Sequence, residues 1–369
     1  MSDQVQQAAV QEEAALMESA TLSRRRMMRL GAVSAAGGLA AAGVVASASP
    51  AAAASPNDWY TVTPGQSIQG ALNSAEAAGG GVVYLTAGTH NVGSTLSMGA
   101  NIILRGAGAN TVLRATATFN FMLELKANSQ ASAVEDLRMF GAGKAGGIRV
   151  TTVGTGLFSG SDSYVSLRNL FVHNTTNQGV LVENGTREAR MHNVVVLSPK
   201  FSHGIDFKGV DSILSDCTAA SAGDGVNGGQ YHGFLIAGGN NRLTGCKAFY
   251  NSGSGFQITG NRGQLSACQA QDNYVDGFRL DGCADVALSA CCSDSNRWVG
   301  LRLRNTLAVT CGDFSSFSRG GGLYVQNHGM RLQSASYSRV TGITRSNTSG
   351  LTTDAASNAT CDTSGVIEA

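Results

Sequence analysis

The stretch that decides the fold runs from Gly204 to Val325, where a glycine is repeatedly followed by an apolar residue, any residue and a second apolar residue. The copies are Gly204-Ile-Asp-Phe207, Gly233-Phe-Leu-Ile236, Gly255-Phe-Gln-Ile258, Gly277-Phe-Arg-Leu280, Gly300-Leu-Arg-Leu303 and Gly322-Leu-Tyr-Val325. The successive glycines are 29, 22, 22, 23 and 22 residues apart. A fixed period in this range indicates one supersecondary unit stacked on copies of itself.

Two further phrases keep the same period. One is Leu214-Ser-Asp-Cys217, Leu243-Thr-Gly-Cys246, Leu265-Ser-Ala-Cys268 and Leu288-Ser-Ala-Cys291, and the other is an asparagine four residues before the glycine, at Asn251, Asn273 and Asn296. Each period holds about three short alternating stretches separated by Gly, Asn, Ser or Asp, a pattern typical of strands and bends. Three strands per turn predict an all-β parallel β-helix, with equivalent residues stacked about 4.8 Å apart. The alternative, a leucine-rich horseshoe, is disfavoured because no helical periodicity separates the glycine phrases.

The residues that precede the repeats add to a resemblance to a known family. Their opening reads Pro64-Gly-Gln-Ser-Ile-Gln-Gly-Ala-Leu72, then Gly79-Gly-Gly-Val-Val-Tyr-Leu85, Ala87-Gly-Thr89 and Leu104-Arg-Gly-Ala-Gly108. Together with the glycine repeats, this opening is similar to the right-handed parallel β-helix proteins of the pectate-lyase-like superfamily, over Asp58 to Val340. The resemblance implies the fold and an N-terminal cap. It leaves the activity open, because the superfamily includes lyases, hydrolases, epimerases, fructan-converting enzymes and phage tailspikes.

Composition limits the partners. The 369 residues carry a net charge of +1 and only 14% are charged, so neither nucleic acid nor another polyanion is indicated as a partner. Glycine accounts for 48 residues, in keeping with frequent bends, and proline for only 4, as expected when most residues must donate to a strand ladder.

The N-terminal residues predict an export signal. Ser23-Arg-Arg-Arg-Met-Met-Arg29 is similar to the twin-arginine motif, with Arg24 and Arg25 as the pair, and a weakly apolar Ala/Gly segment follows. We therefore expect a signal peptide over 1–54, export in the folded state, a secreted or periplasmic location, and no membrane attachment after cleavage. The alternative is a transmembrane anchor, which so many Ala and Gly residues disfavour.

The remaining chain divides into three predicted parts. Residues 55–99 form an N-terminal cap with the first strands, including a short helix from Pro64 to Ala77 that covers the open end of the stack. Residues 100–340 form the β-helix, and 341–369, rich in Ser, Thr and Asn, form a C-terminal tail. Two insertions, Gly154 to Ser163 and Ser221 to Gln230, interrupt the repeats, and insertions on a solenoid often collect on its binding face.

The cysteines predict packing rather than metal binding. Cys217, Cys246, Cys268 and Cys291 share one repeat position, so we expect a ladder of buried free thiols. The other four lie off this ladder, and one pair among them is open to a disulfide: Cys283, Cys292, Cys311 and Cys361. No Cys or His cluster has zinc spacing, and no cofactor or metal is indicated, Ca²⁺ included.

The outward strand positions give the candidate binding residues. In the glycine phrase the apolar residues point inward, so the residue between them points out, and Arg279 and Arg302 then stack on adjacent turns. One interpretation is a solvated lattice of ion pairs, in which Asp281 pairs with Arg304 and Asp276 screens Arg279. The other is a clamp of the two guanidinium groups on the carboxylate of an acidic sugar.

The candidate catalytic residues come from the turn that carries the long insertion. Ser202-His-Gly-Ile-Asp206 and Ala222-Gly-Asp-Gly-Val226 weakly resemble two polygalacturonase motifs, which would make Asp206 and Asp224 the carboxylate pair of a hydrolase. His203 and Gly225 stand where that family has aspartates. The alternative is that Asp206 is a solvated strand residue and Asp224 caps a turn.

A lyase or epimerase instead needs a base and a cation beside a sugar carboxylate, and Lys208, Tyr231 and His232 lie near the same face. Trp298 and Tyr231 are candidate platforms for sugar rings, or covers for the core.

These observations predict a secreted carbohydrate-active enzyme, a glycoside hydrolase or polysaccharide lyase type that cleaves or rearranges a polysaccharide or oligosaccharide in a groove on the β-helix. Asp206, Asp224 and His232 are the candidate catalytic residues. The candidate binding residues are Arg279, Arg302, Tyr231, Trp298, Lys208, Asp276 and Asp281. The alternative is a non-catalytic extracellular module that binds glycans or is structural. The chain is expected to be a monomer or a homotrimer.

Overall fold

The computed structural model describes residues 59–152, 163–223 and 231–368. Three predictions concern residues outside these ranges: the signal peptide over 1–54 with Arg24 and Arg25, most of the two insertions, and Asp224.

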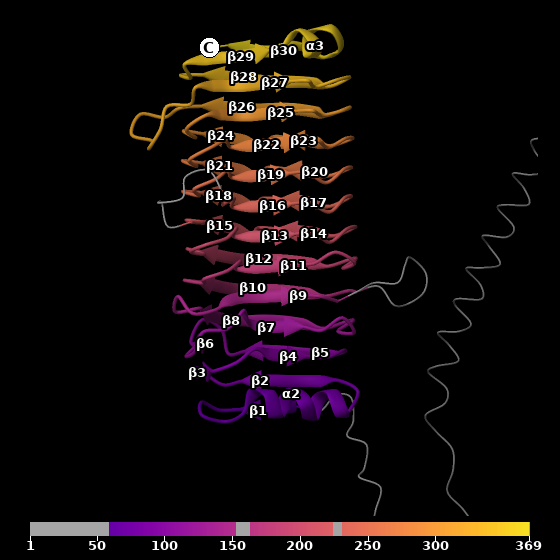
Figure 1. Cartoon of the computed structure of the whole chain (residues 1–369), viewed down its shortest axis with the longest axis vertical. Helices are drawn as coiled ribbons and strands as arrows, with labels where there is room; N and C mark the ends of the chain where they lie inside the picture. The colour runs from indigo at the N-terminus through magenta and orange to yellow at the C-terminus, as the bar shows by residue number, and fades with distance from the viewer. Residues whose placement is uncertain (1–58, 153–162, 224–230, 369) are drawn as a thin grey trace, which may run out of the picture. The chain divides into compact units, whose positions relative to one another are not determined.

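One of the two sheets contains a single strand from each turn of the stack (Figure 1). Its eleven strands pair in parallel, each with the equivalent strand one turn away. They are β4 Leu96–Met98, β7 Phe121–Leu125, β9 Gly146–Val150, β11 Val180–Val182, β13 Ile205–Phe207, β16 Phe234–Ile236, β19 Phe256–Ile258, β22 Phe278–Asp281, β25 Val299–Arg304, β27 His328–Gln333 and β29 Ser349–Thr353. This eleven-stranded sheet contains five of the six glycine phrases, those that begin at Gly204, Gly233, Gly255, Gly277 and Gly300.

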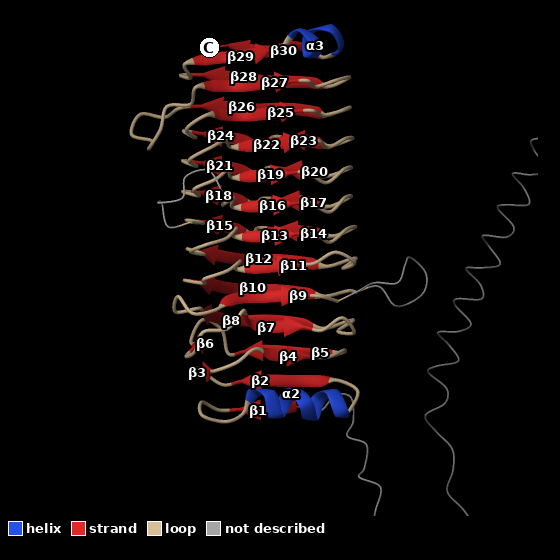
Figure 2. Ribbon diagram, in the orientation of Figure 1, coloured by secondary structure: helices blue, strands red, loops and turns tan. Residues whose placement is uncertain are grey.

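The other sheet contributes two short strands, or one long bent strand, to most turns, and also pairs in parallel. Its nineteen strands are β1 Trp59–Val62, β2 Gly81–Leu85, β3 Gly88–Val92, β5 Ile102–Gly106, β6 Thr111–Ala115, β8 Ala133–Phe140, β10 Ser166–His173, β12 Arg190–Leu197, β14 Ile213–Ser215, β15 Thr218–Ala220, β17 Arg242–Thr244, β18 Lys247–Phe249, β20 Gln264–Ser266, β21 Gln269–Gln271, β23 Ala287–Ser289, β24 Cys292–Asp294, β26 Thr310–Phe317, β28 Arg339–Arg345 and β30 Asp362–Glu368. The predicted all-β parallel β-helix is therefore confirmed, with strands dominating the described chain (Figure 2).

Asparagine and aspartate form the bend inside the long strands. Asp136, Asn169 and Asn193 occupy equivalent positions on successive turns with φ of 58°, 52° and 51°. These residue types tolerate the left-handed conformation better than most others. Asn169 donates to Asp136 Oδ1 at 2.9 Å and Asn193 donates to Asn169 Oδ1 at 3.1 Å. The bend of one turn is thus hydrogen-bonded to the bend of the next.

Helix α2, Ile68–Ala77, covers the N-terminal end of the stack, as predicted (Figure 2). Ser67 caps it, because its hydroxyl accepts the backbone N–H of Gly70 at 3.0 Å. Ile68, Leu72 and Ala75 form its buried face. The second helix, α3, Ala355–Thr360, lies near the C-terminus and is capped by Asp354.

Identical side chains stack inside the β-helix. The rings of Phe234, Phe256 and Phe278 lie 4.8 Å apart from centroid to centroid and nearly parallel. The Asn251 amide donates to Asn273 Oδ1 at 2.8 Å, and the Asn273 amide donates to Asn296 Oδ1 at 2.8 Å. An amide is both donor and acceptor, so each asparagine satisfies the next, and the fully buried ladder leaves few polar groups unpaired.

The predicted thiol ladder is also present. All eight cysteines of the chain are free, and the four on the ladder are buried: Cys217, Cys246, Cys268 and Cys291. Hydrogen bonding within the ladder raises the pKa of Cys268 to about 12, with burial contributing. These thiols therefore act as small apolar side chains that donate weakly to backbone carbonyls. No disulfide joins the four cysteines that lie off the ladder.

Two predictions about the C-terminal end were wrong. Gly322-Leu-Tyr-Val325 is not a strand. The last full repeat is Gly329-Met-Arg-Leu332 in β27, and its glycine lies 29 residues after Gly300. The segment from 341 on is not a tail outside the β-helix, because β28, β29 and β30 continue the parallel pairing to Glu368. The misleading phrase has the right residue types but the wrong environment, since Leu323 and Val325 are each 63% exposed.

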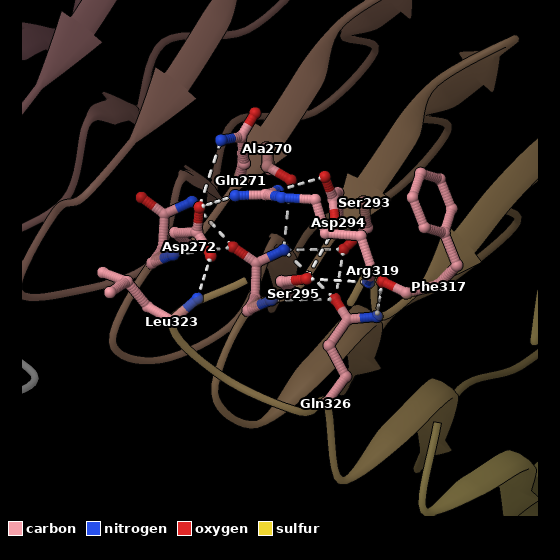
Figure 3. Close-up of polar contacts among 12 residues, drawn as sticks. Ala270, Gln271, Asp272, Ser293, Asp294, Ser295, Phe317, Arg319, Leu323 and Gln326 are labelled. Carbon is pink, nitrogen blue, oxygen red and sulfur yellow. Dashed lines mark hydrogen bonds and ion pairs between the residues drawn. The ribbon is translucent and has the colours of Figure 1, made fainter. Parts of the chain in front are cut away.

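The loop from Ser318 to Asn327, which contains that phrase, is held against the stack by Arg319 (Figure 3). The Arg319 guanidinium donates to both Asp272 and Asp294, the carboxylates of which lie on neighbouring turns and are nearly inaccessible. Asp272 Oδ1 also accepts the Leu323 N–H at 2.8 Å. Gln326 then continues the asparagine ladder, because its Oε1 accepts from the Asn296 amide at 3.1 Å.

We expect Arg319→Ala to lower the free energy of unfolding by about 3 kcal/mol, because two buried carboxylates lose their partner, with a discount for the one-third exposure of the guanidinium. Chemical denaturation would measure this. Arg339→Ala is the matched control, since Arg339 is 70% exposed and its ion pair spans 3.5 Å. Adding Asp272→Asn and Asp294→Asn to Arg319→Ala should recover part of the loss. Equal effects of Arg319→Ala and Arg339→Ala would contradict this account of the loop.

Candidate functional site

Outward-facing residues of the eleven-stranded sheet form one continuous file. In register from β7 to β29 they are Glu124, Arg149, Leu181, Asp206, Leu235, Gln257, Arg279, Arg302, Arg331 and Thr352. Two polar clusters lie along this file, separated by Leu235 and Gln257. We call them the imidazole cluster, around Asp206, and the arginine cluster, around Arg279 and Arg302.

The imidazole cluster is built on a ladder in the turn before the glycine. The rings of His203 and His232 are stacked, 5.1 Å apart with an interplanar angle of 5°. His203 Nδ1 accepts the backbone N–H of His232 at 3.0 Å, and His232 Nδ1 accepts the N–H of Ser254 at 2.9 Å. Each side chain thus bonds the backbone of the next turn. The same position holds Ser254 on the next turn and Asp276 on the turn after that, where Asp276 Oδ1 accepts the N–H of Val299 at 3.2 Å.

These bonds determine the protonation of both histidines. A ring nitrogen that accepts an N–H carries no proton, so the neutral form must carry it on Nε2. Burial, with smaller contributions from the nearby His203 and Arg279, lowers the pKa of His232 to about 3. Burial also lowers the pKa of His203, against the opposing charge of Asp206. Both imidazoles are therefore neutral near pH 7 and can donate hydrogen bonds from Nε2.

Asp206 lies beside this ladder, on the outward face of β13. Its side chain is only 6% exposed. Oδ2 accepts from the Gln178 amide at 3.2 Å and lies 4.0 Å from the Lys208 ammonium, whereas Oδ1 is buried and has no hydrogen-bond partner among the described residues. Asp206 is not the solvated strand residue that the sequence left open. Its buried, half-satisfied carboxylate is a costly arrangement, and such arrangements concentrate at functional sites.

Lys208 and Tyr231 complete the imidazole cluster. Lys208 Nζ lies 3.1 Å from Glu183 Oε2, and Arg149 lies 3.1 Å from the other oxygen of Glu183. Burial raises the pKa of Glu183, but the hydrogen bonds and charges of Lys208 and Arg149 outweigh this and hold it below its usual range. The Tyr231 ring packs edge-on against His203, with centroids 6.1 Å apart. A phenol, an ammonium, two neutral imidazoles and a carboxylate thus meet on adjacent turns.

The arginine cluster has more ion pairing than the sequence predicted. Arg279 lies 2.9 Å from Asp281, and Arg304 lies 3.1 Å from the same carboxylate. Asp276 pairs with Arg302 rather than with Arg279, at 2.9 Å from Nε and 3.1 Å from Nη2. Burial raises the pKa of the Asp276 carboxyl, although Arg302 opposes this. Both predicted clamp arginines are therefore already bound to carboxylates.

The predicted sugar platforms lie in the turns before the strands. Trp298 is 45% exposed, and Tyr231 is half-buried in the imidazole cluster. Next to Trp298 in the chain, Arg297 lies over the ring of Tyr274, 4.2 Å from its centroid. The Trp298 ring is thus open to solvent, whereas the Tyr231 ring packs against His203.

Sequence analysis missed several residues of this face. Gln178 and Glu183 flank β11, a strand outside the six glycine phrases. Arg331 was not predicted because the last repeat was placed at Gly322 instead of Gly329. The spacing contained a usable signal: 29 residues separate Gly300 from Gly329, as they do Gly204 from Gly233, where an insertion also lies.

Two searches of the described ranges gave negative results. Across residues 59–152, 163–223 and 231–368, no three His, Cys, Asp or Glu side chains are placed to share a metal ion. Over the same ranges, no helix has the length and apolar character needed to cross a membrane.

Comparison with known proteins establishes the handedness of the stack. A family model described as "Right handed beta helix region" matches residues 155–314. The fold is a right-handed parallel β-helix. A comparison of the sequence with curated proteins found no significant match.

Solved structures show the same right-handed β-helix at low sequence identity. The A-module of the mannuronan C-5 epimerase AlgE4 of Azotobacter vinelandii is 18% identical, with a TM-score of 0.61 over 80% of this chain and 97% of that one. A mutant of the periplasmic alginate epimerase AlgG is 14% identical, with a TM-score of 0.63 over 79% of this chain and 77% of that one. The enzymatically active domain of tailspike protein 2 of bacteriophage CBA120 is 13% identical, with a TM-score of 0.59 over 74% and 44%.

We expect the stability of the protein to fall as the pH drops from about 6.5 toward 3, partly because of His232. Its pKa is about 3 when folded and about 6.5 when unfolded, so between these values the unfolded chain binds the extra proton. His232→Asn keeps an acceptor for the Ser254 N–H and should reduce this pH dependence. Urea unfolding at several pH values would measure it, with His192→Asn, at an exposed histidine of β12, as control. An unchanged slope in His232→Asn would rule out a buried neutral His232.

Proposed function

We propose that this chain is an exported carbohydrate-active enzyme that acts on a polysaccharide lying along the outward face of the eleven-stranded sheet. Support comes from the polar file on that face and from the structures of the same fold, which include mannuronan and alginate epimerases and an enzymatically active tailspike domain. We propose that the chain is exported by the twin-arginine route, with residues 1–54 as the signal.

We propose that the reaction takes place at the imidazole cluster. Its type is abstraction of the proton beside the carboxylate of an acidic sugar. This class needs donors or cations to stabilise the enolate that forms and a group to exchange the proton. The neutral His203 and His232 would donate from Nε2, and Lys208 would supply the positive charge. Return of a proton from water on the opposite side gives the epimer, whereas departure of the neighbouring ring substituent, which takes up a proton as it leaves, gives an unsaturated lyase product.

Tyr231 is the proposed proton-transfer residue. His232 is poorly suited to act as the base, because Nδ1 is occupied by the Ser254 N–H and Nε2 carries the proton. One carboxylate oxygen of Asp206 is buried and the other accepts a hydrogen bond from Gln178. Its proposed role is therefore to position Lys208 and to balance the charge of that lysine. Arg279, Arg302, Asp276, Asp281 and Trp298 would then line the groove for sugars further along the chain.

The observation that carries this proposal is the meeting of these complementary groups on adjacent turns of one face. Hydrolysis would instead need a second carboxylate at a defined distance from Asp206. Asp224, the residue predicted for that role, lies outside the described residues.

The test uses purified protein and a panel of acidic and neutral polysaccharides in D₂O. Epimerisation incorporates deuterium without chain cleavage, lysis gives new reducing ends together with unsaturated products, and either result supports the proposal. New reducing ends without unsaturated products would replace it with a hydrolase. Binding with no chemical change across the panel would make the chain a glycan-binding module.

If an acidic polysaccharide is turned over, we expect Tyr231→Phe to lower kcat by about 10²-fold or more, with little change in substrate binding, because only the exchangeable proton is removed. Tyr337→Phe is the matched control, since Tyr337 is 74% exposed and lies outside the file. Lys208→Ala should lower kcat as well. Wild-type kcat in Tyr231→Phe would reject the assigned role.

A further inference from the structure

Arg331 differs from the other arginines of the outward file. It lies on β27, directly opposite Arg302 on one side and Thr352 of β29 on the other. Arg279 and Arg302 each lie 2.9 Å from a carboxylate oxygen. Arg331 has no carboxylate within 4.0 Å anywhere in the described part of the chain. Like charges directly opposite on parallel strands repel, so the pair Arg302 and Arg331 retains an uncompensated positive charge.

Arg331 lines a cavity of about 200 Å³ with His328, Gln333 and Thr352. Within the described ranges, two buried polar atoms of these residues have no hydrogen-bond partner: His328 Nδ1 and Thr352 Oγ1. Burial lowers the pKa of His328, with Arg331 and Arg302 contributing, so its ring is neutral and can carry the proton on Nδ1. A buried polar atom without a partner destabilises the protein, and a ligand that bonded both atoms would remove that cost.

Asp354 also lines this cavity but has partners of its own. Its carboxylate caps helix α3 and accepts the backbone N–H groups of Ser334 at 2.7 Å and Ser357 at 2.9 Å. The hydrogen bonds from Ser357 and Ser334 hold its pKa below the usual range. The cavity therefore combines an unpaired guanidinium, a hydroxyl and an imidazole with one occupied carboxylate. It is smaller than a typical drug-sized site, and suits a group of about one sugar ring.

We propose that Arg331, Thr352 and His328 form an anion subsite that binds the carboxylate of an acidic sugar within a longer chain. The guanidinium would bind both carboxylate oxygens, which is its preferred geometry, and the Thr352 hydroxyl and the imidazole would donate to the same group. The choice of an acidic sugar as the ligand rests on the proposed function. The geometry of the subsite does not.

The subsite predicts a length requirement. Five strand spacings separate Asp206 on β13 from Arg331 on β27, through β16, β19, β22 and β25. At about 4.8 Å each, the imidazole cluster and the subsite are roughly 24 Å apart along the sheet. Only a chain of several sugars can occupy both, so a long acidic oligosaccharide should depend on Arg331, whereas turnover of a short one should not.

Binding is measured by calorimetry with oligomannuronates and oligogalacturonates of about three and about eight sugars, chosen to fall short of and to span this distance. We expect Arg331→Ala to weaken binding of the longer chains roughly ten- to hundredfold, the usual effect of losing a charged hydrogen-bond donor. Thr352→Val should weaken it less, and Arg331→Lys should recover only part because lysine lacks the two-pronged geometry. Arg339→Ala carries the same charge change on the other sheet and should bind as wild type does.

Unchanged binding of both longer oligosaccharides in Arg331→Ala, with the thermal unfolding midpoint retained, would overturn the subsite. A sulfated oligosaccharide that has no carboxylates is the second arm: Arg331-dependent binding of the sulfated chain alone would overturn the carboxylate assignment. The two proposals fail separately. If Arg331→Ala weakens binding but no acidic polysaccharide is turned over, the subsite stands and the proposed enzyme activity does not.

Discussion

The structure depends on one constraint: each turn hydrogen-bonds to the next in parallel register, so residues one period apart occupy the same position. In such a stack a slip of one residue would move every inward side chain to the outside. The repeated asparagines oppose such a slip, because each amide bonds to the next only when the turns are aligned. The phenylalanine and cysteine ladders fill the space that the same register creates.

Register also determines the electrostatics of the outward face. A repeated sequence stacks identical side chains on successive turns, which is favourable for apolar rings and unfavourable for groups of the same charge. The chain resolves this in different ways along one file. His203 and His232 stack in the neutral form, because burial lowers their pKa and the backbone of the next turn bonds to Nδ1. Arg279 and Arg302 are balanced by Asp281 and Asp276. In the described part of the chain no carboxylate balances Arg331, and we propose that a ligand takes that place.

Much of the fold could be predicted because its information is local and repeated. The glycine phrase, the cysteine phrase and the asparagine position each recur at nearly the same spacing, so strand number, inward and outward faces, and stacking partners follow from counting. The placement of Asp206, Arg279 and Arg302 in one outward file follows in the same way. Counting failed where the spacing changed: Leu323 and Val325 match the apolar pattern but belong to the loop that Arg319 ties to Asp272 and Asp294.

By itself, the sequence determined the period, the two faces of each strand and the residues that share a file, because these depend only on position within the repeat. The tertiary structure decided which partner each charged group takes. Asp276 binds Arg302 one turn ahead rather than Arg279, and the histidines lose their positive charge, because these outcomes depend on burial and on distances between side chains from different turns. It also decided that Gly329, not Gly322, begins the last full repeat, because strand pairing requires hydrogen bonds along the whole register and a short apolar phrase does not provide them.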